Sequence, residues 1–150
     1  MPSIFDPEVR HLLRNRIAQV STSSVAQWGR MNVHQMVRHC VIWDGWIQGV
    51  RNPTYKREWL GYIFGRLALR VMLKEGRPFD RNIPTLPFFQ ATAETSDLDA
   101  DKERWLELLD AYGHFHNPRF IHDFFGRMSD EQIGTLAYKH SDHHLRQFGA

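Results

Sequence analysis

Two histidines near the C-terminus have the spacing of a metal-binding pair. His140 and His144 lie in the run 138–147, which reads YKHSDHHLRQ. Residues at i and i+4 stack one above the other on a helix, so their imidazole rings can converge on one ion. Histidine is the commonest metal-ligand side chain in proteins. The pair therefore predicts half of a metal site, which needs a third ligand from elsewhere.

The best candidate for the third ligand is His39. It lies within an apolar face of a helix that we expect over about 32–50, so its side chain should point inward. Three neutral imidazoles would leave coordination positions open for water or substrate, which is the catalytic pattern for zinc and related ions. The alternative is three core histidines that hydrogen-bond to carbonyls or to one another. The apolar face contains Met36, Cys40, Trp43, Trp46, Ile47 and Val50.

A helical wheel sorts the neighbours of the histidine pair. Gln147 continues the buried stripe on which both histidines lie, whereas Asp142 and Arg146 fall on the opposite, solvated side. His143 lies at the margin of the stripe. We expect His143 and Gln147, the candidate catalytic residues, to contact the substrate or to support the metal ligands.

The other candidate side chains have simpler interpretations. His34 precedes His39 by five positions, so it should point elsewhere and act as a surface or capping residue. Cys40 diverges from His39 by about 100° on a helix, so we interpret it as a small buried hydrophobe and not as a nucleophile. We interpret the remaining histidines as solvated loop residues, with substrate contact as the alternative: His114, His116 and His122.

The composition predicts one cytoplasmic domain spanning residues 1–150. A chain of 150 residues can bury one sizeable core, and a single cysteine cannot form an internal disulfide. The first residues lack the order of a signal peptide, and the longest apolar stretch is too short to span a bilayer. With a net charge of +2, the chain has no strong field to attract nucleic acid. We expect neither nucleic acid nor a membrane as a partner.

Apolar residues recur at spacings of three and four, which predicts an all-α fold. Asp6 before Pro7 is an N-cap signal, and Asn32 and Ser129 each open a capping box. Ser96, followed three residues later by an aspartate, predicts the cap of the fourth helix. We expect helices over about 7–20, 32–50, 56–74, 96–112 and 129–147. The buried stripe of the first should contain Val9, Leu12, Leu13, Ile17 and Val20.

The third helix is apolar on two sides, which is typical of a helix with two neighbours, one of them a second copy of the chain. Gly61 and Gly65 would allow another helix to approach closely. A membrane-surface role for its cations is a weaker alternative. The proline-containing loop over about 75–95 is long enough to be functional. The two apolar sides contain Leu60, Ile63, Phe64, Leu67 and Val71, and Trp59, Tyr62, Leu69 and Leu73.

Several of these motifs together resemble the DinB-like (damage-inducible protein B) superfamily, and more closely a short uncharacterised branch of it. They are WGRM at 28–31, MVRH at 36–39, FFGRM at 124–128 and the ending over 138–149. The resemblance covers nearly the whole chain. It implies a four-helix bundle in up-down-down-up order, here with an extra short N-terminal or connecting helix and a long loop. It also implies a divalent ion held by His39, His140 and His144, and a homodimer.

Two functions follow from these expectations. The first is a metal-dependent enzyme in which the ion lowers the pKa of a bound water or thiol. The resemblance to the superfamily implies that this enzyme is of the thiol-transferase or hydrolase type. Its substrate would be a small molecule, such as a low-molecular-weight thiol, and its ion zinc or nickel before iron or manganese. The second is a non-enzymatic helical module for binding or dimerisation, with a structural or vestigial metal site.

Overall fold

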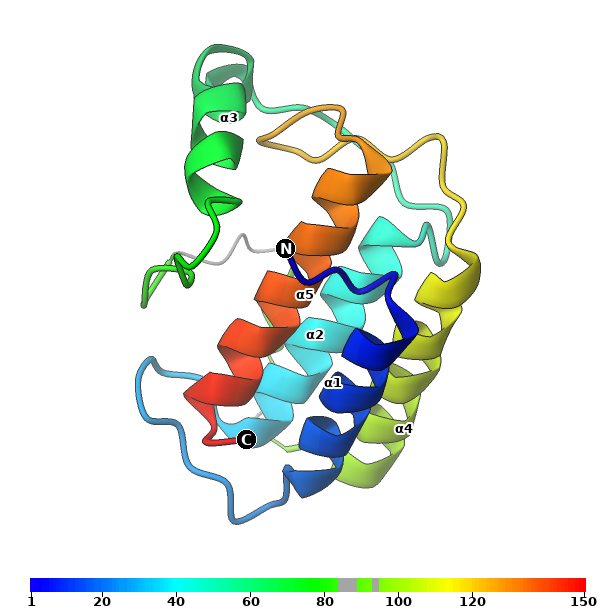
Figure 1. The fold of residues 1–150 in the computed structure, drawn as a ribbon. Helices are drawn as coiled ribbons and strands as arrows, with labels where there is room; N and C mark the ends of the chain where they lie inside the picture. Colours follow the sequence, from blue (N-terminus) through cyan, green and yellow to red (C-terminus); the bar gives the residue numbers. More distant parts are fainter. Residues whose placement is uncertain (84–88, 93–94) are drawn as a thin grey trace.

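The computed structural model describes residues 1–83, 89–92 and 95–150, and over these ranges the chain is all-helical without a β-strand (Figure 1). The predicted all-α class is therefore confirmed, and the predicted helix bounds are right to within a few residues. A short 3-10 helix, η2 (Tyr112–His114), extends the fourth helix. The α-helices are α1 (Pro7–Gln19), α2 (Val33–Ile47), α3 (Trp59–Met72), α4 (Leu98–Ala111) and α5 (Asp130–Gln147).

Local capping explains where most of these helices begin. The Asp6 side chain accepts the N–H of Glu8 and caps α1, with proline in the first turn. Asn32 and Ser129 form complete capping boxes at the starts of α2 and α5. Each box pairs two backbone N–H groups that would otherwise lack partners, so these predicted starts are confirmed.

The predicted cap of α4 is wrong by one residue. Asp97, and not Ser96, accepts the backbone N–H of Ala100 and begins the helix. Ser96 donates its own backbone N–H to Nδ1 of His34, 3.4 Å away. His34 thus joins the start of α2 to the start of α4, which confirms that it points away from His39.

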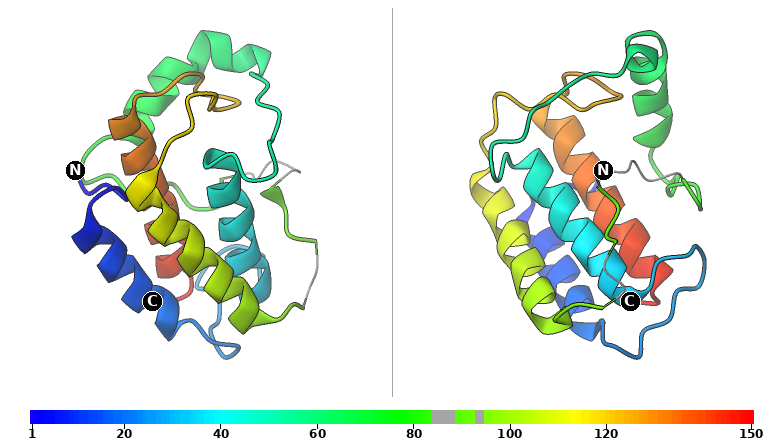
Figure 2. Two further views of the ribbon diagram at one scale, coloured as in Figure 1. Left: turned by 90° about the vertical axis from the view of Figure 1, so that its right-hand side faces the viewer. Right: turned by 180° about the vertical axis from the view of Figure 1, so that it is seen from behind.

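Four helices, α1, α2, α4 and α5, pack lengthwise against one another (Figures 1 and 2). Figure 1 shows that α1 and α5 run in one direction and that α2 and α4 run in the other. Because α2 and α4 are parallel, the chain between them must return along the length of both helices. The long segment 48–97 makes this return and carries α3. The arrangement is compatible with a four-helix bundle.

Helix α3 lies apart from the other four helices (Figure 1) and packs with one face only. Gly61 and Gly65 lie against the backbone carbonyl of Phe124, so the predicted close approach is to a loop and not to a helix. Leu69 and Leu73, from the second of the two predicted apolar sides, are buried. Other large side chains are 40–70 % exposed: Trp59, Leu60, Tyr62, Ile63, Phe64, Leu67 and Val71.

The hydrophobic core lies between α1, α2, α4 and α5 and contains one buried carboxyl group. Leu13 and Ile17 of α1 enter the core, whereas Leu12 is 62 % exposed, so its predicted burial is wrong. Asp44 of α2 is fully buried and accepts hydrogen bonds from Trp105 Nε1 (2.9 Å) and the Tyr112 hydroxyl (2.8 Å). Burial raises the pKa of Asp44 to about 7, although both hydrogen bonds act to lower it.

Two further expectations concern the long loop and the membrane. Part of the predicted loop over 75–95 lies outside the described residues, namely 84–88 and 93–94. The described part supplies Phe79, Arg81 and the buried Phe89 to the region around the histidines. Over the described ranges, each helix is too short or too polar to cross a bilayer.

Candidate metal centre

The structure brings together the three histidines that the sequence singled out. His39 comes from α2, and His140 and His144 come from α5, which packs beside α2 (Figure 2). One ring nitrogen of each residue lies within 4.8 Å of the others. The Nε2 atoms of His39 and His140 are 3.0 Å apart. The inward orientation predicted from the helical wheel is confirmed, and the metal itself stays a prediction.

The cluster lies almost entirely inside the protein. His39, His140 and His144 are 4 %, 8 % and 7 % exposed. Their ring centroids are separated by 5.0 Å (His39–His140), 4.8 Å (His39–His144) and 4.7 Å (His140–His144). The i, i+4 spacing places the two α5 rings on one face, and the packing of α2 against α5 supplies the third ring opposite them.

Hydrogen bonds at Nδ1 orient two of the three imidazole rings. Nδ1 of His39 lies 2.8 Å from the carbonyl oxygen of Phe89, and Nδ1 of His144 lies 2.9 Å from Oε1 of Gln147. A carbonyl oxygen only accepts, so each Nδ1 must carry the proton and donate. Each Nε2 is then left with a lone pair. Outer-shell acceptors of this kind fix the tautomer of metal-binding histidines.

His140 is held by stacking instead of by a hydrogen bond at Nδ1. Its ring stacks on Trp43 with centroids 3.9 Å apart and an angle of 13° between planes. Its Nδ1 is buried without a hydrogen-bond partner in the described ranges, while its Nε2 faces His39. The ring therefore presents Nε2 to the centre of the cluster.

The geometry of the nitrogens fits a divalent ion. Two nitrogens bound at 2.0–2.1 Å to a tetrahedral ion lie roughly 3.3 Å apart, close to the observed separation of the His39 and His140 Nε2 atoms. Without an ion, the N–H of His140 can donate to only one of the two lone pairs that His39 and His144 present at Nε2. With an ion, all three Nε2 lone pairs would bind it, and Nδ1 of His140 is without a partner among the described residues in both cases. The donor set thus fits metal binding better than hydrogen bonds among the three histidines alone.

The histidines of the cluster are held in the neutral form. Burial lowers the pKa of His39 and lowers the pKa of His140 far below its usual value. Burial, with the adjacent His39, lowers the pKa of His144 to about 3. Protons therefore do not compete for the ring nitrogens at neutral pH, as metal coordination requires.

The two candidate catalytic residues differ in their surroundings: Gln147 positions another side chain, whereas His143 is partly exposed to solvent. Gln147 is buried, accepts from His144 and donates through Nε2 to the carbonyl oxygen of Trp28 at 2.7 Å. Both ends of its amide are hydrogen-bonded, so it orients the ring of His144. His143 is half-buried, with its ring edge-on to Trp28 (5.6 Å) and to His144 (5.1 Å).

Asp142 lies outside the cluster, as predicted, but it is not simply solvated. Its carboxylate pairs with Arg16 of α1 at 2.7 Å and lies 3.8 Å from Arg146. The side chain of Asp142 is 23 % exposed, so the expected free exposure is wrong. The reason is that α1 packs against this side of α5.

The remaining candidates lie outside the cluster too. His114 and His116 are exposed, as predicted. His122 is not solvated: its Nδ1 accepts the backbone N–H groups of Phe124 and Phe125, and burial lowers its pKa to about 4. Cys40 is fully buried, which confirms its interpretation as a small hydrophobe, and burial raises its pKa.

Sequence reasoning missed three contributors to the site. Phe89 acts through its backbone carbonyl, which any residue could supply, so no side-chain signal exists for it. Trp43 was assigned to the apolar face, but its stacking on His140 depends on how α2 and α5 pack. Arg81 lies with its guanidinium 4.4 Å from the Trp28 ring, in a loop without periodicity.

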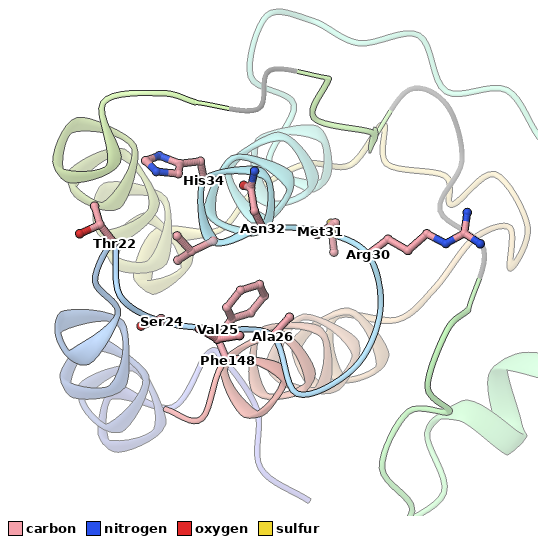
Figure 3. A pocket seen from close by; sticks show the side chains of 10 residues that line it. Thr22, Ser24, Val25, Ala26, Arg30, Met31, Asn32, His34 and Phe148 are labelled. Carbon is pink, nitrogen blue, oxygen red and sulfur yellow. The ribbon is translucent and has the colours of Figure 1, made fainter.

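Two surface hollows lie outside the cluster of His39, His140 and His144. One, of about 370 Å³, is formed by the segment 22–34 and Phe148, and Figure 3 shows the Arg30 side chain pointing away from it. The other, of about 360 Å³, runs beside α3 and reaches Phe79, whose ring lies 5.9 Å from that of His143. Only the second hollow thus approaches the cluster, within the part of the chain that the structure describes.

Comparison with known families gives one match. The family model described as Protein of unknown function (DUF1569) matches residues 10–150. Comparisons with curated proteins and with solved structures gave no match. The matched range includes all three histidines of the cluster and every helix except the first turn of α1.

Proposed function

We propose that this chain, which belongs to the DUF1569 family of proteins of unknown function, binds a divalent metal ion through Nε2 of His39, His140 and His144. The observation that carries the proposal is the convergence of three neutral imidazoles, two of them oriented by acceptors at Nδ1. A cytoplasmic location is part of the proposal, because the single cysteine cannot form an internal disulfide and is buried.

The proposed activity is that of a metal-dependent enzyme of the thiol-transferase or hydrolase type. A divalent ion held by three histidines keeps coordination positions for water or substrate and lowers the pKa of a water or thiol bound there. Imidazole ligands favour zinc or nickel, and iron or manganese are further candidates. His143 is the candidate for substrate contact, because its ring adjoins His144 and is half-buried.

The proposed fold is a four-helix bundle of the DinB-like type. Two observations support it: α1 and α5 run against α2 and α4, and the histidines lie on the second and last helices of this set. The extra helix implied by the resemblance would then be α3, within the long connection between the two parallel helices. The resemblance suggests the reaction class, whereas the metal site rests on the geometry of the histidines.

Metal content tests the proposal directly. Elemental measurement on the purified protein should find one divalent ion per chain, and His144→Ala should lose it together with the thermal stabilisation that the ion provides. His116→Ala changes an exposed histidine and should keep both. A protein without stoichiometric ion, in which His144→Ala leaves ion content and thermal stability unchanged, would refute the metal site.

The alternative, a non-enzymatic dimerisation module, draws on the exposed face of α3. Contiguous exposed apolar patches usually mark interaction surfaces. Leu60, Phe64, Leu67 and Val71 are 40 %, 52 %, 63 % and 42 % exposed, and their spacing of four, three and four is that of a coiled-coil seam. We propose that two copies pair along this seam, whether or not the chain is also an enzyme.

Charge favours an antiparallel pair of α3 helices. The helix carries Arg66 and Arg70 but no acidic residue, so a parallel pair would align both arginines with their copies, whereas an antiparallel pair would align only Arg66. An antiparallel pair brings Glu58, at the start of one helix, near Lys74, past the end of the other. Opposite charges at both ends of the seam would then support the pair.

A further inference from the structure

Trp28 is fixed beside the histidine cluster by the same residue that orients His144. Gln147 donates to the carbonyl oxygen of Trp28 at 2.7 Å, and the carbonyl of Gln147 accepts the N–H of Gln27 at 2.8 Å. Gly29 follows with a φ of +83°, and a Cβ there would meet the Gln147 amide at 2.6 Å. The indole is therefore held in a defined place next to the proposed metal site.

The indole N–H of Trp28 has no hydrogen-bond partner among the described residues. Its Nε1 atom is shielded from water and makes no hydrogen bond in the described structure. A buried donor left unpaired costs roughly 1–3 kcal/mol, a cost that an acceptor on a bound molecule would remove. The same indole forms a T-shaped contact with His143, with ring centroids 5.6 Å apart.

Arg81 adds a positive charge to this corner. Its guanidinium lies 4.4 Å from the Trp28 ring centroid, and its side chain is exposed. The acidic residues around it are engaged elsewhere: Asp80 pairs with Arg77 at 3.1 Å, and Asp142 pairs with a residue of α1. Among the described residues no carboxylate forms an ion pair with Arg81.

We infer that Trp28, Arg81 and His143 form a subsite for a carboxylate of the substrate, beside the three metal ligands. The inference rests on the proposed function and narrows its substrate class to small molecules that bind the metal at one end and carry a carboxylate a few bonds away. A guanidinium recognises a carboxylate in bidentate fashion, and an indole N–H supplies one more donor. Arg81 is exposed, so it can turn from the indole face toward the bound anion.

The surface beside His143 agrees with a carboxylate bound at Arg81 and an apolar part of the substrate bound elsewhere. Phe79 lies 5.9 Å from His143 and lines the hollow of about 360 Å³ beside α3. That hollow is mainly apolar, with Arg77 and Asp80 already paired to each other. The carboxylate therefore belongs at Arg81, and an apolar part of the substrate would extend toward Phe79.

Two thiols of equal chain length test the subsite on the cobalt-loaded protein. 3-Mercaptopropionate and 3-mercapto-1-propanol both bring a thiol to the ion, and their binding is followed by the thiolate-to-cobalt absorption band. The wild-type chain should bind the carboxylate compound about tenfold more tightly, the equivalent of one charge-assisted hydrogen bond. Arg81→Gln and Trp28→Phe should each reduce this preference and leave the affinity for the alcohol unchanged.

Arg77→Gln is the matched control, because it removes a nearby arginine of the same loop that is already paired. It should keep the wild-type preference. Equal affinity of the wild-type chain for the two thiols, or an unchanged preference in Arg81→Gln, would overturn the carboxylate subsite while the metal site stands. A protein that does not bind cobalt would overturn the proposed function and the subsite with it.

Discussion

Replacing Gln147 separates the two tasks that its side chain performs. Oε1 accepts from Nδ1 of His144 at 2.9 Å, and Nε2 donates to the carbonyl of Trp28 at 2.7 Å. Gln147→Leu keeps a buried side chain of similar size but removes both hydrogen bonds. Gln147→Glu keeps an acceptor for His144 and removes only the donor to Trp28.

The expected effect of Gln147→Leu follows from the loss of the hydrogen bond to Nδ1 of His144. Removing the partner of a metal-binding histidine typically weakens metal affinity 10- to 100-fold, or about 1.4–2.7 kcal/mol. Because Gln147→Glu still offers an oxygen to His144, it should bind metal at close to wild-type affinity. It should nevertheless lose part of the preference for 3-mercaptopropionate, since the segment that carries Trp28 is no longer tied to α5.

Competition for zinc with a chelator of known affinity measures the change in metal affinity. Circular dichroism checks that each variant is folded. Rescue of affinity by Gln147→Glu distinguishes orientation of His144 from a general loss of packing. If Gln147→Leu binds zinc within about twofold of the wild type, or if both variants lose affinity equally, the proposed role of Gln147 is wrong.

Three further perturbations test the fold and the surface. The folded pKa of Asp44, about 7, lies above the unfolded value of 3.8, so its contribution to stability falls as pH rises toward 7. Urea unfolding of wild type against Asp44→Asn should show about 2.5 kcal/mol less relative stability of the wild type at pH 8 than at pH 5. Gly65→Ala places a Cβ against the Phe124 carbonyl and should cost about 1–3 kcal/mol in the same assay; unchanged stability would contradict the packing of α3. Leu67→Glu should give monomers in light scattering, whereas Leu12→Glu, at another exposed leucine, should not; an unchanged oligomer would refute pairing through α3.

Much of the helical framework follows from local chemistry that the sequence displays. The caps at Asp6, Asn32 and Ser129 use side chains within three residues of the groups they satisfy, so they are predictable without tertiary structure. The start of α4 is ambiguous because both Ser96 and Asp97 can cap. It is decided by His34, a residue of another helix, which accepts the N–H of Ser96.

Helical periodicity can predict which side chains are buried only when a single face of the helix is apolar. On α3, which is apolar on both sides, it cannot say which face meets the protein. The choice is made by Gly61 and Gly65, whose lack of a Cβ lets the Phe124 carbonyl approach and thereby turns Leu69 inward and Leu67 outward. The glycines were noted in the sequence, but their partner is a loop whose path depends on the whole fold.

The clustering of the three histidines was predictable because the information that places them is mostly local. On α5, His140, His144 and Gln147 lie along one face, so two candidate ligands and one orienting amide share a single rigid element. What the sequence could not supply is the support that crosses between elements: the Phe89 carbonyl on His39 and the Trp28 carbonyl on Gln147. Both are backbone atoms of irregular segments, which carry no residue-type signal. A substitution in either segment that moves its backbone should therefore disturb the site as strongly as a change in an orienting side chain.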